Sequence, residues 1–310
     1  MTLLRKIIKN LKNEYIRMIN PLKLLCKAKL IFDLVSDLHI DQWSPEYRNL
    51  YPCGEIKNSP FEFKKTNSKY LIVAGDVSDD LHLSVEHLNK ISIYYDKILF
   101  VDGNHEHVHI MPKLYSKHYI NDLINSYNND KLIYLPCNSY VIEDTVFIGS
   151  CGWWDYQNKD EDIVKYNYKY FGKRRGFTRD MAIEFINNVF DKSRKEFEYL
   201  KNEIEYYEKN DKIKNIVLVT HSVPKSEFSY NYDKSEYISA GTQYNTLFSQ
   251  ILNKDSGCVK YKKISHWIFG HSHNNHDIYN FETLIRFISN PRGRYEDYNR
   301  TSYSVKELEI

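Results

Sequence analysis

The stretch Ile98-Leu99-Phe100-Val101-Asp102-Gly103-Asn104-His105-Glu106-His107 is the starting point for the fold. Its first half is a short apolar run, which is typical of a strand buried on both faces of a parallel sheet. Its second half places an amide, a carboxylate and two imidazoles where that strand must end. Because open α/β sheets bind ligands at the carboxyl ends of their strands, this position is a candidate site. Glycine and asparagine are also common in turns without any function, so this stretch indicates a site only if other strands end in the same way.

Four further apolar runs also end in polar side chains. The runs cover residues 30–35, 70–74, 216–219 and 266–269, and they lead into Asp37-x-His39, Gly75-Asp76, His221 and Gly270-His271-Ser272-His273. Residues i and i+2 of an extended chain point to the same side, so Asp37 and His39 project together. Gly75 permits a tight turn that points the Asp76 carboxylate back over the sheet edge.

Seven side chains are thereby predicted to gather at one edge of one sheet. They are Asp37, His39, Asp76, Asn104, His221, His271 and His273. Nitrogen and oxygen ligands without a thiolate suit two ions of Mn²⁺, Fe or Zn²⁺ better than a cysteine-rich structural zinc site. The alternative, that each residue is an independent cap or buried imidazole, requires five coincidences at the same end of parallel strands.

Helical patterns alternate with these strands. Apolar spacing predicts helices over 81–95, 113–128, 179–208 and 243–252, a strand pair over 141–149 and a further strand over 284–289. A strand, a helix and a second strand in succession form a parallel β-α-β unit, so the fold class is α/β. Among the histidines that match no ligand position, four near the polar strand ends are expected on or near the surface without a chemical role: His82, His87, His107 and His109.

Charge is unevenly distributed along the chain. Residues 1–29 contain eight Lys and Arg residues against Glu14 alone, a net +7; since the whole chain carries +2, residues 30–310 sum to −5. We therefore divide the chain into a basic N-terminal extension, 1–29, and a catalytic domain, 30–310. Apolar residues recur at helical spacing in the extension, which predicts an amphipathic helix. This helix either packs on the body or lies on an anionic surface such as a membrane or nucleic acid.

The number and spacing of the cysteines and the hydropathy of the chain indicate the cellular compartment in which the protein is expected. The five cysteines are scattered and include no Cys-x-x-Cys pair, which favours reduced thiols over a disulfide framework. No apolar run approaches the ~20 residues that span a bilayer, and lysines interrupt any signal-peptide core. We expect a cytoplasmic protein.

The ordered motifs Asp-x-His, Gly-Asp, Gly-Asn-His-Glu, His and Gly-His-x-His resemble those of the calcineurin-like metallophosphoesterase superfamily, from residue 31 to about residue 300. Within it, Ser36-Asp37-Leu38-His39, the segment 149–155 and Asn290-Pro291-Arg292-Gly293 resemble a branch of small stand-alone phosphoesterases, which does not fix the substrate. The resemblance implies a four-layer α-β-β-α sandwich with a di-metal centre.

The resemblance also implies a role for each residue. Asp37, His39 and His273 would hold one metal ion. Asn104, His221 and His271 would hold the other, and Asp76 would bridge both. His105 would protonate the leaving oxygen or stabilise charge on the phosphoryl group. A carboxylate should orient it, and the sequence leaves open whether Asp76 or a loop residue does so.

Other residues are candidates for substrate contacts. Serine/threonine protein phosphatases of this superfamily continue the Gly-Asp motif with Asp-Arg-Gly, whereas this chain reads Gly75-Asp76-Val77-Ser78-Asp79-Asp80, which disfavours a phosphoprotein substrate. Arg292 and Arg294 are candidates for a phosphate contact, and Arg292 could equally pair with an internal acid. Trp153 and Trp154 could either line a pocket or belong to the core.

The sequence predicts a hydrolase of phosphoric esters, in which water activated by two metal ions attacks a phosphodiester or nucleotide-like small substrate. A nuclease or RNA-processing enzyme, with the basic extension as docking arm, is one alternative. A catalytically silent binding module of the same fold is another.

Overall fold

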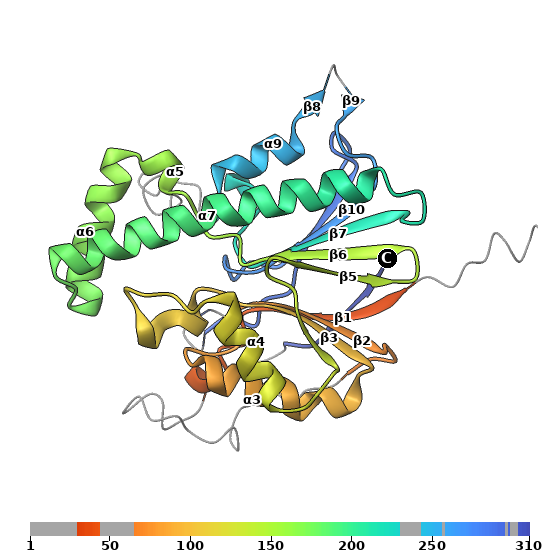
Figure 1. Ribbon diagram of the computed structural model, residues 1–310, viewed down its shortest axis with the longest axis horizontal. Helices are drawn as coiled ribbons and strands as arrows, with labels where there is room; N and C mark the ends of the chain where they lie inside the picture. Colours follow the sequence, from red (N-terminus) through yellow and green to blue (C-terminus); the bar gives the residue numbers. More distant parts are fainter. Residues whose placement is uncertain (1–29, 44–64, 230–242, 256–257, 295–296, 298–302) are drawn as a thin grey trace, which may run out of the picture.

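The computed structural model describes residues 30–43, 65–229, 243–255, 258–294, 297 and 303–310 (Figure 1). The predicted helix of the basic extension, 1–29, lies outside the described residues. In the part of the chain that the structure describes, none of the helices combines the length and the apolar character needed to cross a membrane.

The first sheet has five strands, and it contains three of the five runs singled out in the sequence. Its order is β13 (Lys306–Glu309), β1 (Ile31–Val35), β2 (Tyr70–Ala74), β3 (Lys97–Val101) and β4 (Leu132–Tyr134). Strands β1 to β4 run parallel, and β13 pairs antiparallel with β1 at the edge. The carboxyl ends of β1, β2 and β3 therefore lie next to one another.

The second sheet has six strands and contains the other two runs. Its order is β11 (His276–Asn280), β12 (Ile285–Ser289), β10 (Ile264–Phe269), β7 (Asn215–Thr220), β6 (Thr145–Ser150) and β5 (Asn138–Ile142). The central four strands are parallel, and the outer two are antiparallel. The prediction of one sheet carrying all five motifs was therefore wrong, because the strands divide between two sheets. A further pair, β8 (Lys254–Asp255) and β9 (Cys258–Val259), is short.

Helices cover the outer faces of both sheets (Figure 1). Helices α3 (Leu81–Ile91) and α4 (Lys117–Ser126) pack on the first sheet, and α7 (Arg179–Glu208) and α9 (Ser249–Leu252) pack on the second. Helices α5 (Tyr156–Lys159) and α6 (Glu161–Arg175) lie at the end of the molecule to which the parallel strands point. Short 3-10 turns cover Ile40–Trp43, Ser92–Tyr94, His105–Ile110, Ser226–Phe228 and Thr246–Phe248. The four layers confirm the predicted α-β-β-α sandwich.

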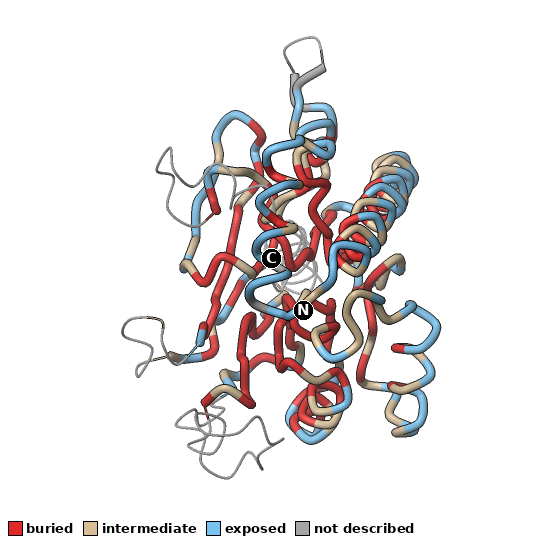
Figure 2. The backbone as a smooth tube through the Cα atoms, turned by 90° about the vertical axis from the view of Figure 1, so that its left-hand side faces the viewer, coloured by how far each residue is buried: buried red, intermediate tan, exposed pale blue. Residues whose placement is uncertain are grey.

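Alternation along the strands explains the apolar runs. In β2, Leu71 and Val73 face α3 and α4, whereas Ile72 and Ala74 face the second sheet. Because both faces of the strand are covered, residues that point to either face are apolar, and the apolar run in the sequence is continuous. Figure 2 shows the buried residues concentrated along the strands, with exposed residues on the outer helices.

Candidate metal centre

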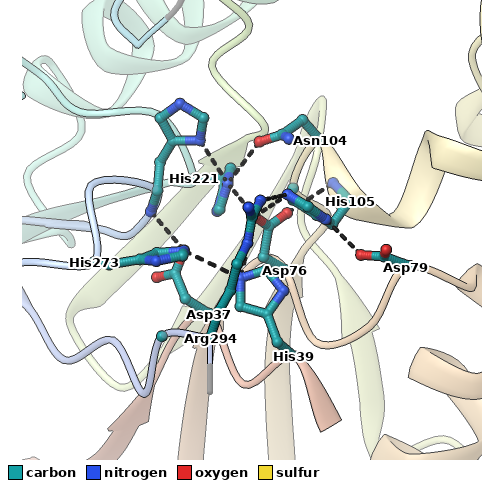
Figure 3. Close-up of polar contacts among 12 residues, drawn as sticks. Asp37, His39, Asp76, Asp79, Asn104, His105, His221, His273 and Arg294 are labelled. Carbon is teal, nitrogen blue, oxygen red and sulfur yellow. Dashed lines mark hydrogen bonds and ion pairs between the residues drawn. The ribbon is translucent and has the colours of Figure 1, made fainter. Parts of the chain in front are cut away.

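The predicted ligands meet where the strand ends of the two sheets adjoin (Figure 3). Asp37, His39, Asp76 and Asn104 follow strands β1 to β3 of the first sheet, and His221, His271 and His273 follow β7 and β10 of the second. Backbone hydrogen bonds join the two groups of loops: the Arg292 amide donates to the Ser36 carbonyl over 3.0 Å, and the Gly293 amide donates to the Asp37 carbonyl over 2.9 Å. The structure thus brings all seven candidate ligands together.

Most of these residues adopt an unusual backbone conformation. Five of the seven have positive φ angles, namely Asp37 (48°), His39 (42°), Asp76 (54°), His271 (69°) and His273 (51°). This left-handed region is uncommon for residues other than glycine, and such residues cluster at functional sites. Asp37 and His39 are therefore not extended, so their convergence comes from these turns and not from the alternation of an extended chain.

The first cluster combines two imidazoles and two carboxylates. His39 Nε2 lies 3.1 Å from His273 Nε2, and His273 Nε2 lies 3.6 Å from Asp37 Oδ1. Asp76 Oδ2 lies 3.9 Å from His39 Nε2. All four side chains are buried, and their ligand atoms converge on one point.

The second cluster is centred on His221. Its Nε2 lies 3.1 Å from His271 Nδ1 and 3.2 Å from both Asn104 Oδ1 and Asp76 Oδ2. Its Nδ1 lies 2.9 Å from the carbonyl oxygen of Ala74, which can only accept, so Nδ1 carries a proton. The Asp76 carboxylate is within reach of both clusters, as a bridging ligand requires.

The donor atoms fit divalent cations. Asp37 Oδ2 is buried without a hydrogen-bond partner among the described residues, although a carboxylate oxygen needs one. Burial alone would lower the pKa of His221, but Asp76 outweighs it and raises this pKa to about 10. The buried carboxylates of Asp76 and Asp37 therefore stabilise a positive charge beside them, which a proton on His221 or a metal cation can supply.

Two imidazoles and the shared carboxylate have the protonation states that metal binding needs. Burial lowers the pKa of His39 well below its usual value, and burial together with His221 lowers that of His271 to about 3. Both imidazoles are therefore neutral at neutral pH and have a lone pair available. Burial acts to raise the pKa of Asp76, but the neighbouring histidines His221 and His105 outweigh it and hold this pKa well below its usual value.

His105 lies beside the clusters and is held by its own carboxylate. Its Nδ1 lies 2.5 Å from Asp79 Oδ1, and its Nε2 lies 2.6 Å from Arg294 Nη2. Because a guanidinium only donates, Nε2 accepts here and Nδ1 donates to Asp79. Burial lowers the pKa of His105, but Asp76 and Asp79 outweigh it and raise this pKa. The structure thus identifies Asp79 as the orienting carboxylate, and the spacing Gly75-Asp76-x-x-Asp79 was the available signal.

Glu106 connects the ends of β2 and β3. Its buried carboxylate accepts backbone hydrogen bonds from Asp76 (3.1 Å), Val77 (2.7 Å) and Gly103 (2.7 Å). A β-carbon on Gly103 would lie 2.1 Å from Asp76 Oδ1, so only glycine fits there. These contacts fix the backbone that carries Asp76.

Asp297 contacts one of the candidate ligands and was missed in the sequence. Its Oδ2 lies 2.6 Å from His273 Nδ1 and accepts a second bond from the Arg294 amide, also over 2.6 Å. A carboxylate on the second nitrogen of a ligating histidine fixes the ring and its tautomer. Sequence spacing gave no signal for this residue, because its position depends on the path of the chain after β12.

Of the four candidate substrate contacts, two line a cavity over the clusters and two are buried elsewhere. Arg294 and Trp154 line a cavity of about 480 Å³ over the clusters, and the Trp154 ring lies 5.5 Å from that of His271. Arg292 is buried away from this cavity, with its guanidinium 4.1 Å from the Trp43 ring. Trp153 is fully buried in the core beside α7.

The expectation that the unmatched histidines are at the surface was wrong for two of them. His107 is fully buried, and its Nε2 lies 2.7 Å from Asp102 Oδ2. His87 is also buried, on the inner side of α3. His82 and His109 are exposed, as expected.

The fold and the paired clusters are those of a metal-dependent phosphoesterase. The family model of the calcineurin-like phosphoesterases matches residues 31–275, so the chain belongs to this family of phosphoric ester hydrolases. This match confirms the resemblance seen in the strand-end motifs. Arg294 and Asp297 lie beyond the matched range.

Two comparisons give the chain's relatives. It is 26% identical over 249 residues to the uncharacterized protein L509 of Acanthamoeba polyphaga mimivirus, covering 78% of this chain and 84% of that protein. The solved structure of phosphopantetheinyl hydrolase from Mycobacterium tuberculosis is similar with a TM-score of 0.58 and 17% identity, covering 91% of this chain and 96% of that one. At this identity the likeness concerns the fold.

Proposed function

We propose that the protein hydrolyses a small phosphodiester or nucleotide-like ester with two divalent cations. The observation that carries the proposal is the pair of nitrogen and oxygen clusters that share Asp76, with His105 directly beside them. His105 Nε2 lies 3.9 Å from Asp76 Oδ2, so a phosphoryl group at the clusters would be within its reach.

Asp37, His39 and His273 would hold one cation, and Asn104, His221 and His271 would hold the other, with Asp76 shared between them. When bound, the two cations would lower the pKa of a water molecule and neutralise charge on the phosphoryl oxygens. The donor set contains imidazole and oxygen without sulfur, which supports Mn²⁺, Fe or Zn²⁺. The amide oxygen of Asn104 is neutral and keeps the charge on its side of the centre more positive than a carboxylate would.

When Arg294 binds a phosphoryl oxygen instead of His105 Nε2, this nitrogen can carry a second proton and give it to the leaving oxygen, while Asp79 holds the ring through Nδ1. Arg294, which contacts His105 Nε2, is placed to bind a phosphoryl oxygen at the same position. Guanidinium groups match phosphate geometry with paired donors. The cavity of about 480 Å³ is within the range of small-molecule sites, which supports a small substrate.

The test is hydrolysis of bis-p-nitrophenyl phosphate and p-nitrophenyl phosphate by metal-stripped protein, before and after addition of Mn²⁺. We expect activity to return with Mn²⁺, to be greater on the diester, and to be lost in Asp76→Asn and His105→Ala. No turnover of either ester by protein that demonstrably binds Mn²⁺ would favour the silent binding module. Mononucleotides, cyclic nucleotides and short RNAs would then separate a small-molecule enzyme from a nuclease.

We further propose that the basic extension, 1–29, binds an anionic surface and that the protein acts in the cytoplasm. The net +7 of the extension supports the first proposal, and the free thiols of Cys137 and Cys151 are consistent with the second. Binding of liposomes and of nucleic acid by the full chain should exceed that of a chain starting at Lys29. Equal binding would refute the role of the extension.

A further inference from the structure

Helix α6 forms one wall of the cavity over the candidate metal centre. Tyr166 and Tyr170 lie one turn apart on this helix, so their side chains share a face. Their rings are stacked, with centroids 6.4 Å apart and planes at 20°. Each is 42% exposed, and both line the cavity that has Asp76 and His105 at its base. The two tyrosines therefore present a continuous aromatic surface to the cavity.

Apolar side chains from three other elements also line the cavity, beside polar ones such as Gln243. Trp154 follows β6, Phe185 comes from α7, and Met111 comes from the turn after β3. The cavity therefore has a polar base, where the phosphoryl group would bind, and an aromatic outer part. A cavity that combines aromatic side chains with convergent polar groups is typical of sites for small organic ligands.

A cation lies on the same wall. Arg175, at the end of α6, is exposed and lines the cavity, and none of the described carboxylates forms an ion pair with it. A guanidinium can contact an anion or stack on a flat ring. Its presence beside the two tyrosines favours a ligand that is both aromatic and anionic over an uncharged aliphatic one.

We infer that α6 is the recognition element for the organic group of the substrate, and that this group is a nucleobase stacked on the face formed by Tyr166 and Tyr170. The inference rests on the proposed function, because the nucleotide's phosphoryl group must reach His105. Stacking on an aromatic side chain contributes about 5- to 150-fold in affinity per base and accepts any base. The substrate class is thereby narrowed to nucleotides and their esters.

The experiment compares two esters that release the same p-nitrophenol. Water converts thymidine 5′-(p-nitrophenyl phosphate) to thymidine monophosphate and p-nitrophenol, and it converts methyl p-nitrophenyl phosphate to methyl phosphate and p-nitrophenol. With Mn²⁺, we expect the full chain to prefer the thymidine ester at least about 10-fold in kcat/KM. The double variant Tyr166→Leu/Tyr170→Leu should lose most of this preference. Each single variant should lose part of it, which guards against misfolding of the double variant.

Tyr206→Leu is the matched control, since Tyr206 is an exposed helical tyrosine on α7 outside this cavity. This variant should retain the preference for the thymidine ester. Equal kcat/KM for the two esters in the wild-type protein, or an unchanged preference in folded Tyr166 and Tyr170 variants, would overturn the inference while the proposed function stands. Hydrolysis of neither ester by Mn²⁺-loaded protein would instead refute the proposed function.

Discussion

Replacing Asp79 with asparagine separates the proton-donating role of His105 from metal binding. Asp79 Oδ1 lies 2.5 Å from His105 Nδ1, and both side chains are buried. A hydrogen bond to a charged group contributes about 1.5–3 kcal/mol, which corresponds to about 10- to 150-fold in rate. We expect kcat to fall by this factor when the carboxylate becomes an amide.

The assay compares two leaving groups. Phenol, with a pKa of about 10 like that of tyrosine, needs a proton as it leaves, whereas p-nitrophenol is much more acidic and needs it less. Asp79→Asn should therefore slow diphenyl phosphate hydrolysis more than bis-p-nitrophenyl phosphate hydrolysis. Since Asp79 raises the pKa of His105, the variant should also lose activity at a lower pH on the alkaline side of its profile.

The neighbouring carboxylate provides a control. Asp80 caps α3 by accepting from the amides of His82 and Leu83, and asparagine caps a helix equally well, so Asp80→Asn should behave like the wild-type protein. Equal losses on both esters in Asp79→Asn, with an unshifted pH profile, would show that Asp79 only stabilises the loop.

Three further predictions concern metal affinity, stability and packing. Asp297→Asn should lower Mn²⁺ affinity about 10- to 100-fold in calorimetric titration of metal-free protein, because the histidine it contacts loses its orientation; unchanged affinity would contradict this. Burial lowers the pKa of His87 to about 4 from about 6.5 in the unfolded chain, so the unfolded state takes up a proton first and stability falls as the pH drops below about 6.5. Between pH 7.5 and pH 5.0 the wild-type protein should lose about 2 kcal/mol more unfolding free energy than His87→Leu in urea titrations, and parallel losses would exclude His87 as the cause. Gly103→Ala should displace Asp76 and abolish Mn²⁺ binding, whereas Gly172→Ala, whose new β-carbon would come no closer than 3.6 Å to its neighbours, should bind Mn²⁺ normally.

The strand ends could be predicted from the sequence because each follows a mainly apolar run, which only Asp33 interrupts before Asp37. The runs before Asp76 and Asn104 face helices on one side and the other sheet on the other, so no polar residue interrupts them. Their division between two sheets could not be predicted. The runs before Asp76 and His221 have the same apolar pattern, and which strands pair depends on contacts distant in the sequence.

Helix α6 could not be predicted for a related reason. Of its residues, Ile163 and Asn167 are buried, while Tyr166 and Tyr170 face the cavity, so the residues do not form one regular apolar stripe. The helix is held through its packing on α7, which a periodicity argument does not detect. The contact of Asp297 with the candidate centre likewise depends on tertiary structure alone.

The two sheets each supply part of the ligand set, so a cation bound at the candidate centre would connect the two sheets of the sandwich. In the proposed arrangement each cation would take ligands from both sheets, with Asp37, His39, Asp76 and Asn104 from the first and His221, His271 and His273 from the second. A cation at 1,000 times its dissociation constant adds about 4 kcal/mol to the free energy of unfolding, and here that gain would depend on the sheets staying together. Removal of metal should therefore weaken the junction between the sheets first, so that the protein's resistance to unfolding would depend on the same ions as its chemistry.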